Sequence, residues 1–237
     1  GLGEYLCGHH VLQAHAKAYH LYKNTYSAEQ KGQVGICLYS AYFYPLNENV
    51  NSSLADQALH HMLGWFAHPI FSENGDYPHI MIDNGKRNRA DRPWSRLPEL
   101  TEQEKQSLKG SADFLALNYY TSRYVQPIEQ YPEEHTWDSD AGIVQSVDPS
   151  WPKAKSSFLY SVPNGLHDLL VFIKDNYNNP TVLITENGWS DSGELEDDDR
   201  ITYLREPLSA ISRAINNGCN VKAYTVWSII DNFEWLA

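Results

Sequence analysis

The hydrophobic positions of this chain fall into two spacings that alternate along its length. In three segments, apolar side chains recur every three or four residues, which predicts helices that bury one face. These segments lie at residues 6–22, 163–173 and 201–215. Short apolar runs at 34–38, 114–117 and 181–184 are typical of buried parallel strands, and 221–227 has the alternating character of a further strand.

Capping residues predict two more helices. Ser53 to Asp56 resembles a capping box and opens a helix that we expect to run to about Trp65, where His68-Pro69 then interrupts it. Thr101 to Glu104 is a better capping box, and Gly110 is a suitable C-terminal stop. Two stretches rich in Pro, Gly, Asn or Asp, residues 72–98 and 123–157, are expected to be long loops.

The resulting order is α, β, α, β, α, β, α, β, which predicts parallel strands joined by right-handed crossovers. Four strands are half of the eight that a closed (β/α)₈ barrel requires. We therefore predict an α/β fold in which residues 1–237, as a single domain, form the second half of a TIM barrel, strands five to eight. A doubly wound open sheet is the alternative, but no Gly-rich phosphate turn follows any strand.

Composition narrows the class of protein. The 237 residues are 42% hydrophobic and carry a formal net charge of −12, so nucleic acid and anionic membranes are poor candidate partners. The sequence contains no run of eighteen apolar residues, so it does not predict a transmembrane helix. Asn51-Ser52-Ser53 is one N-glycosylation sequon, which favours a secreted, extracellular protein. The chain begins at Gly1 rather than Met, so we expect that a segment can precede it.

Cysteine and histidine spacing favours neither disulfides nor metal. Cys7, Cys37 and Cys219 are odd in number and lack a C-x-x-C spacing, so we expect buried free thiols. Among the histidines, His15 and His20 are five residues apart, off the i, i+4 face that a helical metal site uses. Asp197 to Asp199 is expected to be a solvated loop because it lacks the Gly of a calcium loop.

Polar and aromatic side chains stand where three predicted strands end. Glu186 ends one strand, Asn118 and Tyr120 follow another, and Trp227 ends the last. Because the carboxyl ends of parallel barrel strands share one rim, we expect these groups to lie close together. A strand-end carboxylate is often structural and a strand aromatic is usually core. Their agreement instead favours a sugar site, in which carboxylates and amides bind hydroxyls and indoles stack on the C–H face.

Three longer motifs surround these residues. They are Leu-Asn-Tyr-Tyr-Thr at 117–121, Ile-Thr-Glu-Asn-Gly at 184–188 and Val-Trp-Ser-Ile-Ile-Asp-Asn-Phe-Glu-Trp at 226–235. Together they resemble glycoside hydrolase family 1, the β-glucosidases and their thioglucosidase relatives, the myrosinases. Flanking segments match as well, so the resemblance covers essentially the whole chain. The sequence resembles animal and insect members of the family more than bacterial ones. This resemblance implies a retaining β-glycosidase that hydrolyses terminal β-D-glucosides through a covalent intermediate, without a cofactor.

The resemblance implies a role for each matching residue. Glu186 is the nucleophile that attacks the anomeric carbon, Tyr120 positions its carboxylate, and Asn118 belongs to the pocket for the sugar. Trp227 resembles the Trp that stacks on the sugar. Glu234 is expected to accept hydrogen bonds from two sugar hydroxyls, and Trp235 to donate another.

Two departures from the family pattern leave alternatives open. The family's acid/base Glu stands in an Asn-Glu-Pro motif, which this sequence lacks, so the chain is expected to need the N-terminal half-barrel. Phe158 stands where relatives often have a Trp that stacks on the leaving group, the aglycone. The alternatives are therefore a thioglucosidase, or a non-hydrolytic barrel or fragment that binds sugar. The aglycone and the oligomeric state stay open.

Overall fold

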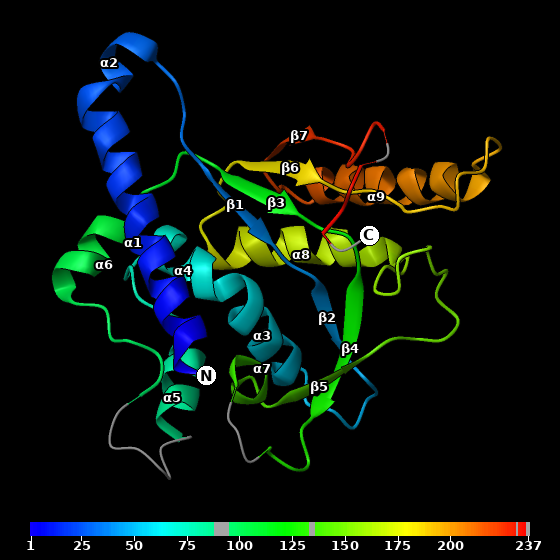
Figure 1. Cartoon of the computed structure of the whole chain (residues 1–237), viewed down its shortest axis with the longest axis horizontal. Helices are drawn as coiled ribbons and strands as arrows, with labels where there is room; N and C mark the ends of the chain where they lie inside the picture. Colours follow the sequence, from blue (N-terminus) through cyan, green and yellow to red (C-terminus); the bar gives the residue numbers. More distant parts are fainter. Residues whose placement is uncertain (88–94, 133–135, 231, 236–237) are drawn as a thin grey trace.

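Four parallel strands form the main sheet. The computed structural model describes residues 1–87, 95–132, 136–230 and 232–235. The sheet consists of β1 (Ile36–Tyr39), β3 (Leu115–Asn118), β6 (Val182–Glu186) and β7 (Val221–Tyr224). Its strand order, β1-β3-β6-β7, is the order of the chain, and every neighbouring pair is parallel (Figure 1). A doubly wound sheet reverses its strand order, whereas a barrel does not, so this order favours the barrel.

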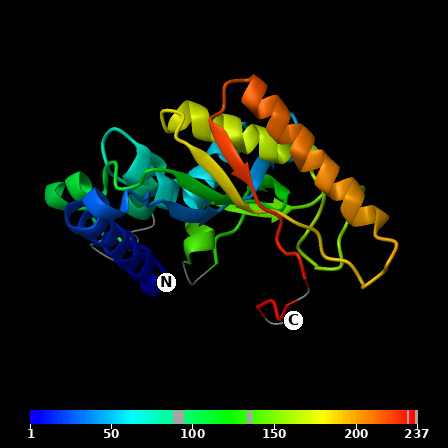
Figure 2. The same cartoon turned by 90° about the horizontal axis from the view of Figure 1, so that it is seen from above.

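Helices cover one face of this sheet. They are α8 (Pro163–Asn176), α9 (Asp198–Asn216) and the continuous series α3 (Ser53–Leu59), π-helical η1 (His60–Gly64) and α4 (Trp65–Phe71). Figure 2 shows α8 and α9 together on one side of the sheet and the C-terminal segment on the other. Their buried leucines and isoleucines form one hydrophobic core with the helix-facing residues of the strands.

The opposite face of the sheet is open. On β1, Ile36 and Leu38 are buried against the helices, whereas Cys37 and Tyr39, which alternate with them, are exposed. Parallel sheets are normally covered on both faces. In a closed barrel the uncovered face would line the barrel interior, so the alternation along β1 is that of a half-barrel.

A second, smaller sheet was not predicted. It has the order β2-β4-β5, from β2 (Tyr42–Pro45), β4 (Ser122–Pro127) and β5 (Ile143–Ser146). The prediction that 123–157 is only a loop is therefore wrong, because most of β4 and all of α7 (Trp137–Asp140) and β5 lie within it; its residues 133–135 lie outside the described part of the chain. The loop predicted at 72–98 likewise contains α5 (His79–Arg87), and its residues 88–94 lie outside the described part of the chain.

The predicted helices are present, with corrections at their ends. Helix α1 (Leu2–Thr25) is followed by the single turn α2 (Ser27–Gln30), and α6 (Glu102–Leu108) has the predicted capping box. In it, the Glu104 N–H donates to Thr101 Oγ1 over 3.3 Å. Gly110 follows α6 with a φ of +71°, a conformation that Gly adopts without strain.

Three other local predictions are wrong. Ser52 rather than Ser53 precedes α3 and makes no side-chain cap hydrogen bond. Pro69 lies inside α4, in the last turn of the continuous helical series, so His68-Pro69 does not interrupt the helix, which continues to Phe71. Asp197 caps α9 by accepting a hydrogen bond from the Arg200 N–H, so the acidic run begins a helix instead of staying in a loop.

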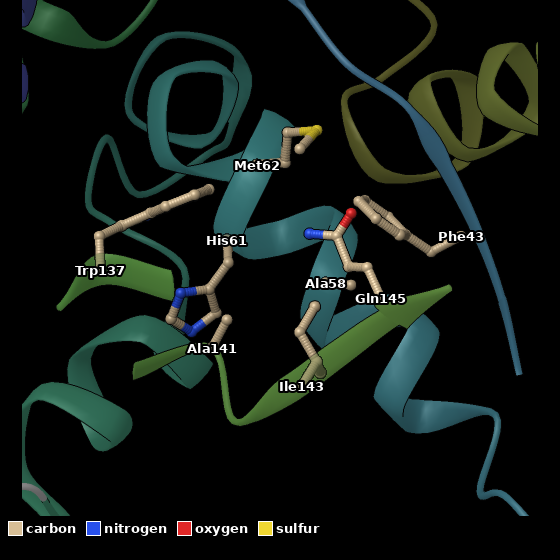
Figure 3. Close-up of a pocket in the computed structure, with 8 residues that line it drawn as sticks. All are labelled: Phe43, Ala58, His61, Met62, Trp137, Ala141, Ile143 and Gln145. Atoms are coloured by element: carbon tan, nitrogen blue, oxygen red, sulfur yellow. The ribbon is translucent and has the colours of Figure 1, made fainter. Parts of the chain in front are cut away.

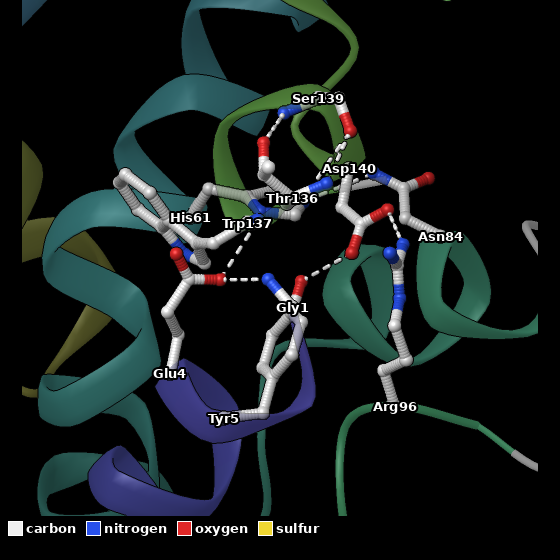
Figure 4. A network of polar contacts seen from close by, with 10 residues as sticks. All are labelled: Gly1, Glu4, Tyr5, His61, Asn84, Arg96, Thr136, Trp137, Ser139 and Asp140. Carbon is white, nitrogen blue, oxygen red and sulfur yellow. Dashed lines mark hydrogen bonds and ion pairs between the residues drawn. The ribbon is translucent and has the colours of Figure 1, made fainter. Parts of the chain in front are cut away.

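A polar network fixes the start of α1 (Figure 4). The Tyr5 hydroxyl donates to Asp140 Oδ2 over 2.7 Å, and Arg96 forms a buried ion pair with the same carboxylate. Glu4 accepts from the Trp137 N–H over 3.3 Å. These contacts join α1, α7 and the segment before α6, so we assign the network a structural role.

The cysteines are all free, as expected, but only Cys219 is buried; Cys7 and Cys37 are exposed. Cys37 is exposed because it lies on the open face of β1. Among the helices of the described residues, none is long and apolar enough to cross a membrane.

Candidate active site

Glu186 owes its position to an irregularity between β3 and β6. Leu117 pairs with Ile184, but the next residue of β3, Asn118, pairs with Glu186, so β6 has one extra residue, Thr185. Such a bulge breaks the alternation of side chains between the two faces of a sheet. Thr185 and Glu186 are both partly exposed, while Ile184 is buried among the helices. The bulge thereby places Glu186 at the open face.

Tyr120 holds the carboxylate of Glu186. Its hydroxyl donates a hydrogen bond of 2.8 Å to Glu186 Oε2, the contact that the sequence predicts. Burial raises the pKa of the Tyr120 phenol well above its ordinary value, and the hydrogen bond to Glu186 raises this pKa further. The phenol therefore stays protonated at neutral pH and remains a donor to the carboxylate.

Asn118 lies beside the same carboxylate, at the end of β3. Its Oδ1 accepts 2.6 Å from the Thr185 hydroxyl and 3.3 Å from the Cys37 thiol. The amide carbonyl is thus oriented by its neighbours, which leaves the Nδ2 donor directed to the other side of the side chain. An N–H donor next to Glu186 suits a hydroxyl group of a ligand.

Trp227 and Glu234 come together beyond β7. The Trp227 indole N–H donates to Glu234 Oε2 over 3.0 Å, and Glu234 is near enough to Tyr120 to raise its pKa. Trp227 is 42% exposed, so part of its side chain is accessible. Trp235 is 87% exposed and takes part in none of the hydrogen bonds found for the described residues. Asp231, within the same motif, lies outside those residues.

Two residues that the sequence did not single out lie at the centre of the site. Asn187, fully buried directly after Glu186, has hydrogen bonds to three tyrosines, and its backbone carbonyl accepts from the Trp227 N–H over 2.9 Å. Gly188 lets these backbones approach, because a Cβ on it would lie 1.8 Å from the Trp227 carbonyl oxygen. The only signal in the sequence is that both residues follow the candidate nucleophile.

Arg123 was also missed. This guanidinium on β4 donates to the carbonyls of Ser122 and Phe158 and to the Thr121 hydroxyl. Burial lowers its pKa, and the charged or polar groups that act on it are tyrosines, including Tyr39 at the end of β1. Phe158 is 52% exposed. A cation surrounded by neutral oxygens therefore lies beside the predicted aglycone residue.

A cavity of about 320 Å³ lies elsewhere, between the second sheet and η1 (Figure 3). Its lining contains none of the predicted site residues. The lining residues are Phe43, Ala58, His61, Met62, Trp137, Ala141, Ile143 and Gln145. The clustered carboxylates lie instead at the open side of the main sheet, at and beyond its strand ends. Among the described residues, no group of three or more potential metal ligands is found.

Comparison with known proteins identifies the family. The family model described as glycosyl hydrolase family 1 matches residues 2–237. The chain belongs to this family. Its curated relatives include Myrosinase 1 of Brevicoryne brassicae, 42% identical over 98% of this chain and 51% of that protein. The lactase-like protein of Homo sapiens is 40% identical over 99% of this chain and 42% of its own length.

Solved structures of family 1 enzymes agree with this assignment. Aphid myrosinase superposes with a TM-score of 0.90 at 41% identity and covers 99% of this chain and 51% of its own. A mutant rice β-glucosidase in a covalent complex with Glc gives a TM-score of 0.87 at 34% identity over 98% of this chain and 50% of its own. The chain spans about half the length of the relatives that it matches. The predicted fold, the second half of a (β/α)₈ glycosidase barrel, is confirmed.

Proposed function

We propose that this chain supplies the nucleophile and part of the sugar pocket of a retaining β-glycosidase that acts on terminal β-D-glucosides. The hydrogen bond between Tyr120 and Glu186 carries the proposal, because it orients a carboxylate at the strand ends of a family 1 barrel. Asn118 and the pair of Trp227 and Glu234 surround that carboxylate with groups suited to sugar hydroxyls and a sugar ring.

In the proposed reaction, a Glu186 oxygen attacks the anomeric carbon and the bond to the leaving-group oxygen breaks. A second carboxyl group, about 5–5.5 Å away, donates its proton to that oxygen, which leaves a glycosyl ester on Glu186. The second group, now a carboxylate, removes a proton from water, and this water cleaves the ester and frees Glu186. The sequence has no Asn-Glu-Pro motif, so we place the second group on the first half of the barrel.

Within this mechanism the neighbours of Glu186 have distinct roles. Tyr120, neutral because of its raised pKa, donates to Glu186 Oε2 and fixes the orientation of the carboxylate. Trp227 stacks on the sugar, Glu234 accepts hydrogen bonds from the sugar hydroxyls, and Trp235 donates another. Each of these groups binds the sugar without itself forming or breaking a bond.

The proposal also requires a partner half-barrel. The inner face of the sheet is open, and β1 and β7 have unpaired edges within the described residues. Large apolar side chains are exposed there and beyond β7, among them Tyr39 at 47% and Ile229 at 94%. Exposed edges and patches of this kind favour association. We propose that residues 1–237 form one domain only together with strands one to four.

Covalent trapping tests the function. The complete barrel can be made by fusing this chain behind the first half of the aphid relative, and then treated with 2,4-dinitrophenyl 2-deoxy-2-fluoro-β-D-glucoside. We expect one added fluoroglucosyl group on the peptide that contains Glu186, and none in the Glu186→Gln variant. Label on another peptide would refute the assigned nucleophile. Reversible binding without label would favour the non-hydrolytic sugar-binding protein.

A thioglucosidase is the second candidate, and Arg123 favours it. Its charge is surrounded by neutral oxygens beside Phe158, so an anionic aglycone would supply the missing counter-charge. Cleavage rates of neutral and sulfated β-thioglucosides can be compared in wild-type protein and in Arg123→Met. If the substitution lowers the cleavage rate of the sulfated substrate only, then Arg123 recognises the aglycone. Equal effects on both substrates would exclude that role.

We also propose that the protein is secreted. The sequon residue Asn51 is exposed just before α3, on the surface position that an N-linked glycan requires. Expression in a eukaryotic secretory system should therefore give a mass that falls on treatment with an N-glycosidase, and Asn51→Gln should abolish this change. A mass that enzyme treatment leaves unchanged would contradict use of this sequon.

A further inference from the structure

We propose that Asn187 is a positioning residue for the nucleophile, acting through a buried chain of hydrogen bonds that ends at Tyr120. The inference rests on the proposed function of Glu186. Asn187 is fully buried at the point where β6 ends, and its side chain contacts elements that are far apart in the sequence. A buried amide with this many partners is fixed in one orientation.

Each polar atom of the Asn187 side chain has a buried or half-buried partner. Its Nδ2 donates to the Tyr119 carbonyl and to the Tyr203 hydroxyl, both over 2.8 Å. Its Oδ1 accepts from the Tyr224 hydroxyl, also over 2.8 Å. One side chain therefore ties β6 to the end of β3, to α9 and to the end of β7.

This chain of contacts continues to the residue that holds the nucleophile. The Tyr203 hydroxyl, which accepts from Asn187, donates in turn to the Tyr120 carbonyl over 3.0 Å. The Tyr119 N–H donates to the Glu186 carbonyl over 3.0 Å, so β3 and β6 are also joined here by their backbones. The backbone at both ends of the Tyr120–Glu186 hydrogen bond is thus held by Asn187 or its partners.

The same residue also positions the sugar-stacking side of the site. Its backbone carbonyl accepts from the Trp227 N–H, next to the close approach that Gly188 permits. One buried residue, Asn187, is therefore connected by hydrogen bonds both to the segments that hold the nucleophile and to the residue that carries the stacking ring. Because misplacement of a reacting group by about 1 Å can cost roughly 100-fold in rate, loss of this network should slow attack by Glu186.

Single-oxygen deletions test the network in the complete barrel. Tyr203→Phe removes the hydroxyl between Asn187 and Tyr120. Tyr177→Phe is the matched control, because Tyr177, directly after α8, is equally buried, at 3% exposure, and its hydroxyl has no partner among the described residues. The measured quantities are the first-order rate constant of labelling by the fluoroglucoside at each reactive site and, separately, the number of sites that can be titrated. The Ki of glucose, a reversible ligand, is measured in parallel.

We expect Tyr203→Phe to lower the labelling rate constant per site by about 10- to 100-fold with the Ki of glucose unchanged, and Tyr177→Phe to leave both values unchanged. Asn187→Leu should lower the rate at least as far, and adding Tyr203→Phe to it should lower it no further, because the two residues act as one unit. A purely structural role would instead reduce the Tm and the number of titratable sites.

An unchanged rate constant per site in Tyr203→Phe and Asn187→Leu would overturn the positioning role. That result is distinguishable from failure of the proposed function. If wild-type protein is labelled at Glu186 and the variants react at the wild-type rate, only the role of Asn187 falls. If wild-type protein is not labelled at Glu186, both inferences fall.

Discussion

Replacing Tyr120 by Phe removes one oxygen from the site and leaves the ring in place. The lost contact is the 2.8 Å hydrogen bond to Glu186 Oε2. A hydrogen bond to a charged group is worth about 1.5–3 kcal/mol. Because both side chains are only half-buried, water can replace part of the contact, and we expect about 1.5–2 kcal/mol. This corresponds to a fall in kcat/KM of roughly 10- to 30-fold.

The assay is hydrolysis of 4-nitrophenyl β-D-glucopyranoside by the complete barrel. Tyr44→Phe is the matched control, because the Tyr44 hydroxyl donates to the Asp168 carboxylate over 2.6 Å, also at a half-buried position but in the second sheet. We expect Tyr44→Phe to lower the Tm without changing kcat/KM. If both variants lose activity equally, or if Tyr120→Phe is as active as wild type, then the Tyr120 hydroxyl does not orient the nucleophile.

Three further predictions concern binding, pH and assembly. Glu234→Gln, which weakens the acceptor of the Trp227 indole N–H and of the sugar hydroxyls, should raise the Ki of glucose about tenfold; an unchanged Ki would remove Glu234 from the pocket. Burial lowers the pKa of His61 from 6.5 to about 4, so the free energy of unfolding should fall as the pH drops from 6.5 to 4, by at most about 3 kcal/mol, with no effect above pH 7. Urea titrations at pH 7 and pH 5 should show this loss in wild type and a smaller one in His61→Gln. Residues 1–237 alone should aggregate in sedimentation experiments, and a soluble monomer with cooperative unfolding would contradict the need for a partner half-barrel.

The main sheet could be predicted because two of its strands, β3 and β6, are continuous apolar runs. Leu115 to Leu117 and Val182 to Ile184 are apolar and end at a polar side chain, which marks the rim. The contact between Tyr120 and Glu186 follows from two strand ends in one parallel sheet, and the structure contains it. The catalytic and binding roles of these residues stay predictions until substrate or inhibitor is tested.

The second sheet could not be predicted, because its pairing is long-range and its strands are short. Tyr42 pairs with Ser122, eighty positions later, and β2 ends in a Pro that is typical of a loop. Helix α5 has a clear apolar side but contains Asn84 and Gly85, which are poor helix formers. In both cases tertiary contacts outweigh the local preference of the residues.

The bulge and the Asn187 network were hidden for a different reason. A one-residue shift of register leaves no trace in composition, because Thr185 fits a regular strand as well as a bulge. The importance of Asn187 depends on three tyrosines that lie 68, 16 and 37 positions away. Such a set can be recognised only when the strand ends are already in place.

The chain-order arrangement of the main sheet has a consequence for how activity could be controlled. Since β1 and β7 are its two edges, the proposed nucleophile and its acid partner would lie on contiguous, separable pieces of polypeptide. When the pieces are covalently joined, turnover would be independent of dilution. As separate chains they would form a split enzyme, whose activity would rise with the product of the two concentrations and would report directly on their encounter.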